Sequence, residues 1–129
     1  MILADTSVWV DHFRHGNPRL RELLEAGEVA MHPMVLGEIA CGNLARRGVT
    51  LRFLEHLPVV PQLPDHVVRE AIEARRLWGK GIGWVDAHLL AAALVSDVFL
   101  WTLDQRLARL RSEEHTSELQ SLAYLVCRL

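Results

Sequence analysis

Hydrophobic residues along this chain fall into short unbroken runs separated by longer stretches with helical spacing. An apolar run without alternation is typical of a strand buried on both faces, as in a parallel sheet covered by helices. Such runs predict strands over residues 1–5, 29–31, 58–61 and 98–101. Prolines bracket the run at 58–61, which limits it to a short strand.

The stretches between these runs repeat hydrophobic residues every three or four positions, which indicates amphipathic helices. They predict helices from about Val8, over residues 18–26, 33–46, 50–57, 65–78 and 84–95, and after Asp104. Thr6 and Ser7 offer a cap for the first helix, Asp65 caps the helix over 65–78, and Gly48 breaks the chain. Strands that alternate with helices in this way predict a three-layer α/β/α fold around a short central parallel sheet.

The composition predicts a single domain, and it restricts any nucleic-acid binding to a small part of the surface. The chain has 129 residues, half of them hydrophobic, and a net charge of -2, so it lacks the broad basic surface of non-specific nucleic-acid binders. Cys41 and Cys127 are too few for a disulfide scaffold and lack zinc-binding spacing. No apolar segment has the length of a membrane helix and Met1 begins no leader, so we expect a cytoplasmic protein.

Four carboxylates stand at positions typical of functional groups. Asp5 and Asp104 each follow an apolar strand, and α/β folds place their sites at the edge where parallel strands end. Glu38 and Asp86 share helix faces with hydrophobic residues, where an unpaired charge is costly to bury. Acids that converge without a basic partner repel one another, and a divalent cation relieves that repulsion. Oxygen ligands favour Mg²⁺ or Mn²⁺ over zinc.

Each of these acids also has a purely structural interpretation. Asp86 and Asp104 suit the first turn of a helix, where the helix dipole favours an acid, and Asp5 suits an anchor for the turn that follows it. This explanation is weakest for Glu38, because its burial would require an arginine partner that the sequence does not identify. The residue pattern alone leaves both interpretations open.

Other reactive or aromatic residues form no recognisable site. His12, His15 and His88 lack a ligand pattern, so we expect surface or helix-capping roles. The glycines around Lys80 do not follow the order of a phosphate-binding loop, and they suit a flexible entrance beside Asp86. The tryptophans are expected in the core or at dimer contacts rather than stacked on bases: Trp9, Trp78, Trp84 and Trp101.

Four segments resemble, in order, the motifs of VapC-type PIN-domain toxins. They read ILADTSVW at residues 2–9, LGEIACG at 36–42, GIGWVDAHLLA at 81–91 and WTLDQRL at 101–107. The resemblance extends from Met1 to about Leu110. It implies a toxin that cleaves RNA phosphodiester bonds and is silenced by a cognate VapB-type antitoxin. We also expect a homodimer.

The same resemblance assigns roles to the acids and to three neighbouring hydroxyl groups. It implies that Asp5 and Asp86 are the principal ligands of one or two Mg²⁺ or Mn²⁺ ions. Glu38 and Asp104 complete the catalytic cluster directly or through water. The supporting polar groups are Thr6, Ser7 and Thr102.

From Arg111 the sequence changes character. Residues 111–121 resemble the conceptual translation of a short-read sequencing adaptor. We therefore predict a PIN-like nuclease domain over residues 1–110 and a non-native tail over 111–129. On this interpretation the last edge strand, which borders Asp104, is lost and a neighbouring strand edge is unpaired. Ordinary genomic DNA through these codons would contradict it.

Three other functions fit parts of the pattern. A phosphoacceptor signalling domain also has acids at strand ends, but it requires a lysine after a late strand, whereas Lys80 precedes a helix. A haloacid-dehalogenase-like phosphatase requires a second acid where Ser7 stands. The intact acids disfavour a catalytically impaired PIN-like domain that only binds protein.

Overall fold

A short parallel sheet lies at the centre of the protein. The structure is a computed structural model that describes residues 1–115, and within them three strands pair in the order β2-β1-β3. Their bounds are β1 (Ile2–Ala4), β2 (Val29–Ala30) and β3 (Phe99–Trp101). Ile2 of β1 lies opposite Val29 on one side and opposite Phe99 on the other.

The strand predicted over residues 58–61 is reduced to a single bridge. Val59 pairs with Met31 in parallel, and the flanking hydrogen bonds run from the Met31 N–H to Pro58 O (2.7 Å) and from the Val60 N–H to Met31 O (2.9 Å). Pro58 and Pro61 have no N–H to donate, so the pairing cannot extend into a longer ladder.

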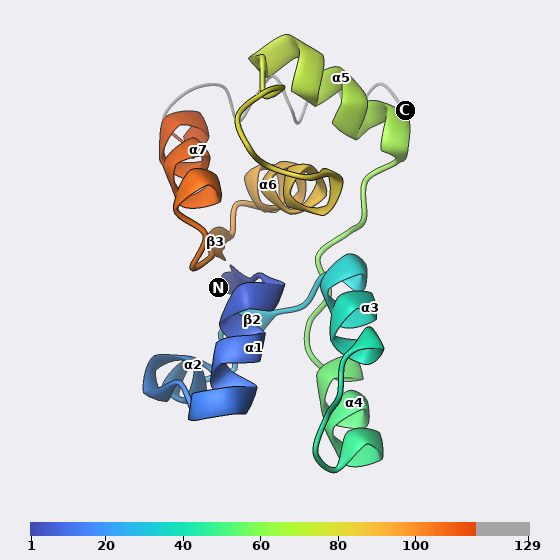
Figure 1. The fold of residues 1–129 in the computed structure, drawn as a ribbon, viewed down its shortest axis with the longest axis vertical. Helices are drawn as coiled ribbons and strands as arrows, with labels where there is room; N and C mark the ends of the chain where they lie inside the picture. The colour runs from blue at the N-terminus through green and yellow to red at the C-terminus, as the bar shows by residue number, and fades with distance from the viewer. Residues whose placement is uncertain (116–129) are drawn as a thin grey trace.

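Helices cover both faces of the sheet. Their bounds are α1 (Thr6–His15), α2 (Pro18–Glu25), α3 (Pro33–Cys41), α4 (Arg47–Glu55), α5 (Asp65–Arg75), α6 (Trp84–Ser96) and α7 (Gln105–His115). α5, α6 and α7 lie on one side of the strands, and α1 to α4 lie on the other (Figure 1). This arrangement confirms the predicted three-layer α/β/α fold. In the described range no helix combines the length and hydrophobicity needed to span a membrane.

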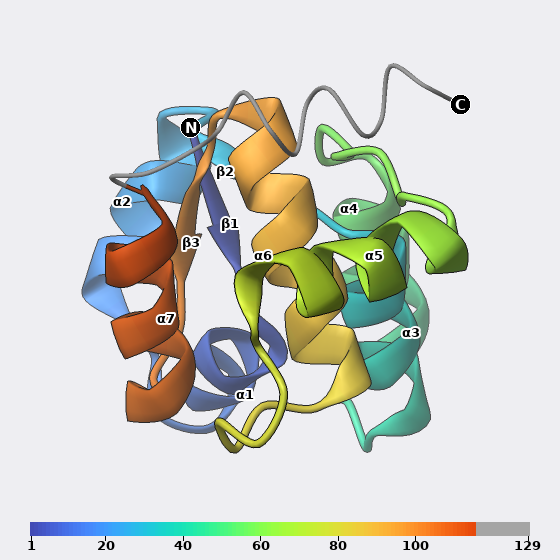
Figure 2. The same cartoon turned by 90° about the horizontal axis from the view of Figure 1, so that it is seen from above.

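The sheet and α6 bring several distant segments to one end of the molecule. α6 is buried over eight consecutive residues, Ala87 to Leu94, because its sequence is apolar on nearly every side. β1 and β3 run toward the end at which α1, α6 and α7 begin (Figure 2). The residues that follow β1 and β3 therefore lie near the first turn of α6.

Several helix boundaries differ from the sequence prediction. α1 begins at Thr6 with Asp5 as its cap, not with Thr6 or Ser7 as the cap. α3 ends at Cys41 because Gly42 is extended, and α4 includes Gly48, since the chain reverses at the left-handed Arg46 (φ 48°) instead. α5 ends at Arg75, before the left-handed Arg76, and its first residue Asp65 makes no capping bond.

α7 continues past the boundary predicted at Leu110. The Arg111 guanidinium donates a hydrogen bond to Leu100 O (2.8 Å) and stacks 4.4 Å from the centre of the Phe99 ring. The greater part of the tail predicted over 111–129, residues 116–129, lies outside the described residues. The domain boundary, the foreign tail and the loss of an edge strand therefore stay predictions.

Candidate functional site

Asp5 is the most deeply placed acid of the site. It directly follows β1, is only 5% exposed and caps α1. Its Oδ1 accepts hydrogen bonds from the Ser7 hydroxyl (2.5 Å) and the Val8 N–H (3.2 Å), and its Oδ2 accepts one from the Thr102 hydroxyl. A buried carboxylate held by three donors has a fixed position.

Two hydroxyl groups connect the segment after β1 to the segment after β3. Ser7 Oγ accepts a hydrogen bond from the Leu103 N–H (3.1 Å), and Thr102 Oγ1 accepts one from the Asp104 N–H (3.0 Å). Both hydroxyls also donate to Asp5. Sequence motifs about 100 residues apart thus form one hydrogen-bonded unit around this carboxylate.

Asp104 and Asp86 each cap a helix in addition to facing this end of the sheet. Asp104 Oδ1 accepts hydrogen bonds from the N–H groups of Arg106 (2.8 Å) and Leu107 (3.3 Å), at the start of α7. Asp86 is half-buried in the first turn of α6, and its Oδ2 accepts a hydrogen bond from the Gly83 N–H (3.1 Å). The structural interpretation of these two acids is therefore correct, although it leaves their remaining oxygens available.

Glu38 is exposed, which differs from the expectation that it lies on a core-facing stripe. Its neighbours on α3, Val35 and Ile39, are buried, but the Glu38 side chain leaves the core and accepts a hydrogen bond from the Thr6 hydroxyl (2.7 Å). This contact joins α3 to the start of α1. No buried arginine is needed, because the carboxylate keeps its access to water.

The negative charges of the other three acids reach Asp86. Burial raises the pKa of the Asp86 carboxyl above its ordinary value, and the hydrogen bond from Gly83 opposes that shift. Three nearby carboxylates raise the Asp86 pKa further through their negative charges: Asp5, Asp104 and Glu38. Within residues 1–115 no lysine or arginine forms an ion pair with any of these four acids. In this part of the chain their repulsion is therefore not relieved by an ion pair with a protein cation.

The acids do not form a ready coordination shell. In the described part of the chain, no three histidine, cysteine, aspartate or glutamate side chains are grouped so that they could hold a metal ion. Charge repulsion acts over longer distances than coordination bonds. The acids can therefore repel one another although no three of them are grouped closely enough to hold one ion together. Oxygen donors that have no basic partner among the described residues fit a hard divalent cation, but the side chains accept hydrogen bonds from their own local donors.

Two buried histidines were missed by sequence reasoning. His88 is completely buried on α6 instead of at the surface, with its Nε2 3.3 Å from Asp65 Oδ1. His32 caps α3 by accepting a hydrogen bond from the Met34 N–H (3.0 Å), and burial followed by the charge of His88 lowers its pKa to about 4. The available signals were the position of His88 on an apolar helix and of His32 before a helix-starting proline.

The tryptophans divide into buried and exposed pairs. Trp9 is buried as expected and Trp101 is partly buried, but 57% of Trp78 and 40% of Trp84 remain exposed. Trp78 and Trp84 are thus not core residues. Trp84 packs edge-on against His88, with the ring centres 4.5 Å apart and the planes at 90°.

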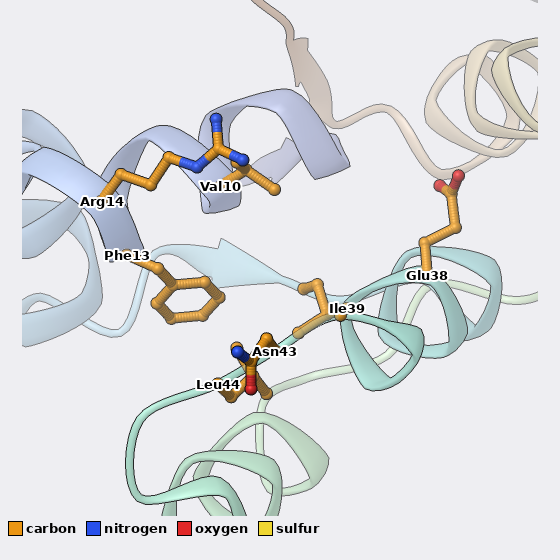
Figure 3. A pocket seen from close by; sticks show the side chains of 8 residues that line it. Val10, Phe13, Arg14, Glu38, Ile39, Asn43 and Leu44 are labelled. Carbon is orange, nitrogen blue, oxygen red and sulfur yellow. The ribbon is translucent and has the colours of Figure 1, made fainter.

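A groove between α1 and the end of α3 begins beside Glu38. Its lining includes Phe13, Arg14, Ile39 and Leu44. In Figure 3 the side chains of Phe13, Ile39 and Leu44 face the groove, while the Glu38 carboxylate points away from them. The groove is therefore apolar inside and carries a charged group at each flank.

Known proteins resemble this chain over most of its length. The profile of the PIN domain matches residues 2–113. Ribonuclease VapC32 of Mycobacterium tuberculosis, from strain CDC 1551 and from strain H37Rv, is 46% identical over 108 residues. This alignment covers 83% of the present chain and 87% of each relative.

Proposed function

The chain belongs to the PIN-domain family, as a VapC-type member, and we propose that it is a metal-dependent endoribonuclease acting as the toxin of a toxin–antitoxin pair. The observation that supports this function best is the gathering of four carboxylates from distant segments without a basic partner among residues 1–115. Such a cluster repels itself unless a cation or a proton is bound. The named relative is a ribonuclease, which supports RNA as the substrate.

We assign Asp5 and Asp86 as the principal ligands of one or two Mg²⁺ or Mn²⁺ ions, with Glu38 and Asp104 completing the cluster directly or through water. Such an ion supplies a water of lowered pKa and neutralises charge on the phosphate. No side-chain nucleophile is required.

The hydroxyl groups act as positioning residues for these ligands. Ser7 and Thr102 hold the two oxygens of Asp5, and Thr6 holds Glu38. Groups that orient a ligand typically change metal affinity by about 10- to 100-fold when removed. Loss of any of these hydroxyls is therefore expected to weaken metal binding without removing a ligand.

The direct test is cleavage of a single-stranded RNA by the 129-residue chain with Mn²⁺. We expect cleavage by the unmodified protein and by Asp97→Asn, which makes the same chemical change at the far end of α6. Cleavage should be lost in Asp5→Asn, in Asp86→Asn and after chelation of the metal. Undiminished cleavage in both site variants would reject this site.

A VapB-type antitoxin is the protein partner that we propose. A segment lying in the groove of Figure 3 would cover the exposed Phe13 and reach Glu38, so it would shield the acids from RNA. Phe13→Ala should weaken the complex with the antitoxin more than Phe53→Ala, which removes an exposed ring from α4. Equal affinities would contradict this placement. The homodimer stays a prediction.

A catalytically impaired, protein-binding PIN domain is the second candidate. One observation favours it: in residues 1–115 no three potential ligands are grouped as a metal site. In that case the chain would bind its partner with the affinity of a toxin but would cut no RNA with any divalent metal.

A further inference from the structure

Two exposed tryptophans line a hollow next to the first turn of α6, which carries Asp86 of the candidate site. Trp78 and Trp84 line it together with Gly79, Gly83 and the apolar side chains of α5 and α6. The loop between α5 and α6, which carries Trp78, crosses the same end of the molecule as the starts of α6 and α7 (Figure 2). The hollow is therefore at the end of the protein where the acids gather.

The hollow is open and its walls are suited to a flat apolar group. A Cβ placed on Gly79 or on Gly83 would meet nothing within 4 Å, so the space above both glycines is free. The edge-on contact with His88 fixes the plane of the Trp84 ring. Indole surface left in water is unfavourable, and two exposed indoles that line the same hollow offer apolar surface that a bound group could cover.

The surroundings of the hollow favour a nucleotide over a purely apolar occupant. Lys80 is exposed in the loop between the two tryptophans. The Arg106 guanidinium lies 3.5 Å from Gly81 O, and a Cβ on Gly81 would come within 2.6 Å of Arg106 Cδ, so this side chain covers the same loop. Lys80 belongs to the loop that joins the two tryptophans, and Arg106 contacts that loop. Cationic groups close to exposed aromatic rings are typical of surfaces that bind single-stranded nucleic acid.

The hollow is also joined to the proposed chemistry by a hydrogen bond. Gly83, which lines it, donates its N–H to Asp86, one of the two proposed principal ligands. We propose that the hollow lined by Trp78 and Trp84 is a nucleobase subsite, in which one base of the RNA stacks on an indole ring while the neighbouring phosphate reaches the candidate metal site. This inference rests on the proposed nuclease function.

The experiment compares cleavage of one single-stranded RNA by the 129-residue chain and three variants, with kcat/KM as the readout. Trp78→Ala removes the more exposed ring, Trp78→Phe keeps a flat ring, and Phe53→Ala is the control, because Phe53 is 52% exposed on α4. Loss of stacking on one base should lower kcat/KM by about 5- to 100-fold in Trp78→Ala. Trp78→Phe should stay within about 3-fold of the unmodified chain, and Phe53→Ala should be unchanged.

A second series distinguishes base stacking from a general structural role. Each nucleotide near the cut is replaced in turn by an abasic nucleotide. The unmodified chain should lose activity at one such position, and Trp78→Ala should show no further loss there, because the same contact is already missing.

The results separate this inference from the nuclease proposal. Cleavage by the unmodified chain with an unaffected Trp78→Ala variant would overturn the subsite alone. The subsite would also be overturned if Trp78→Ala lowered kcat/KM by the same factor at every abasic position. If Trp78→Ala instead converted a dimer to a monomer, the hollow would be a contact between copies of the chain and the subsite would again be overturned. Failure of the unmodified chain to cut any RNA would overturn both.

Discussion

Replacing Thr102 with valine should destabilise the fold because it removes the hydroxyl that bridges Asp5 and Asp104. Valine has nearly the same shape, so packing around this buried position is kept. The hydroxyl donates to the buried Asp5 carboxylate and accepts a hydrogen bond from the Asp104 N–H (3.0 Å). A hydrogen bond to a charged group contributes about 1.5–3 kcal/mol, and the bond from the Asp104 N–H contributes about 1 kcal/mol. We therefore expect Thr102→Val to lower the free energy of unfolding by about 2.5–4 kcal/mol.

Urea unfolding followed by circular dichroism measures this change. The matched control is Thr50→Val on α4, where the hydroxyl donates only to the neutral Ala45 O (3.2 Å) and the expected loss is about 1 kcal/mol. In an Asp5→Asn background the cost of Thr102→Val should shrink by at least about 1 kcal/mol, since the charged acceptor is gone. If Thr102→Val costs no more than Thr50→Val, the bridge does not hold Asp5 in place.

Two further predictions follow from the titratable groups. His32 has a pKa of about 4 in the folded chain and an ordinary pKa of 6.5 in the unfolded chain, so between these values the unfolded chain binds one more proton. The contribution of neutral His32 to stability is therefore complete above pH 6.5. It falls by about 3 kcal/mol as the pH drops to about 4. His32→Asn, which can still cap α3, should flatten this part of the urea-midpoint curve, and an unchanged curve would contradict the assignment. Asp86→Asn should unfold at a higher urea concentration than the unmodified chain when no metal is present, because burial and three nearby acids oppose the charge of Asp86. The same variant should lose cleavage, because a proposed metal ligand is removed. A variant less stable than the unmodified chain in EDTA would contradict the proposed repulsion.

Much of the fold follows from local sequence because its strands and helices have distinct hydrophobic patterns. Residues 2–4 and 99–101 are apolar on both faces, as buried parallel strands must be, and this also placed Asp5 and Asp104 at one edge. The exact helix ends were harder to predict. They depend on single residues in left-handed conformation, Arg46 and Arg76, which no propensity would favour.

The sequence selected the candidate residues, whose role as a metal site stays a prediction, but it could not give their geometry. The positions of Asp5 and Asp86 follow from strand and helix ends, whereas the exposure of Glu38 depends on how α3 is rotated against α1. The rotation of one helix against another depends on tertiary packing. The pattern of hydrophobic residues around Glu38 therefore predicted a core-facing position for this side chain that the structure does not have. His88 was misjudged for a related reason: burial on every side of α6 leaves no polar face on which a histidine can lie.

The central claim is that the four carboxylates share a bound cation. Titration of Mn²⁺ into the 129-residue chain, with free Mn²⁺ followed by electron paramagnetic resonance, tests this claim without any choice of RNA. The account predicts that the unmodified chain and Asp97→Asn remove Mn²⁺ from solution equally, and that Asp86→Asn and Asp5→Asn remove far less. Equal binding by all four proteins, or binding by none, would contradict it.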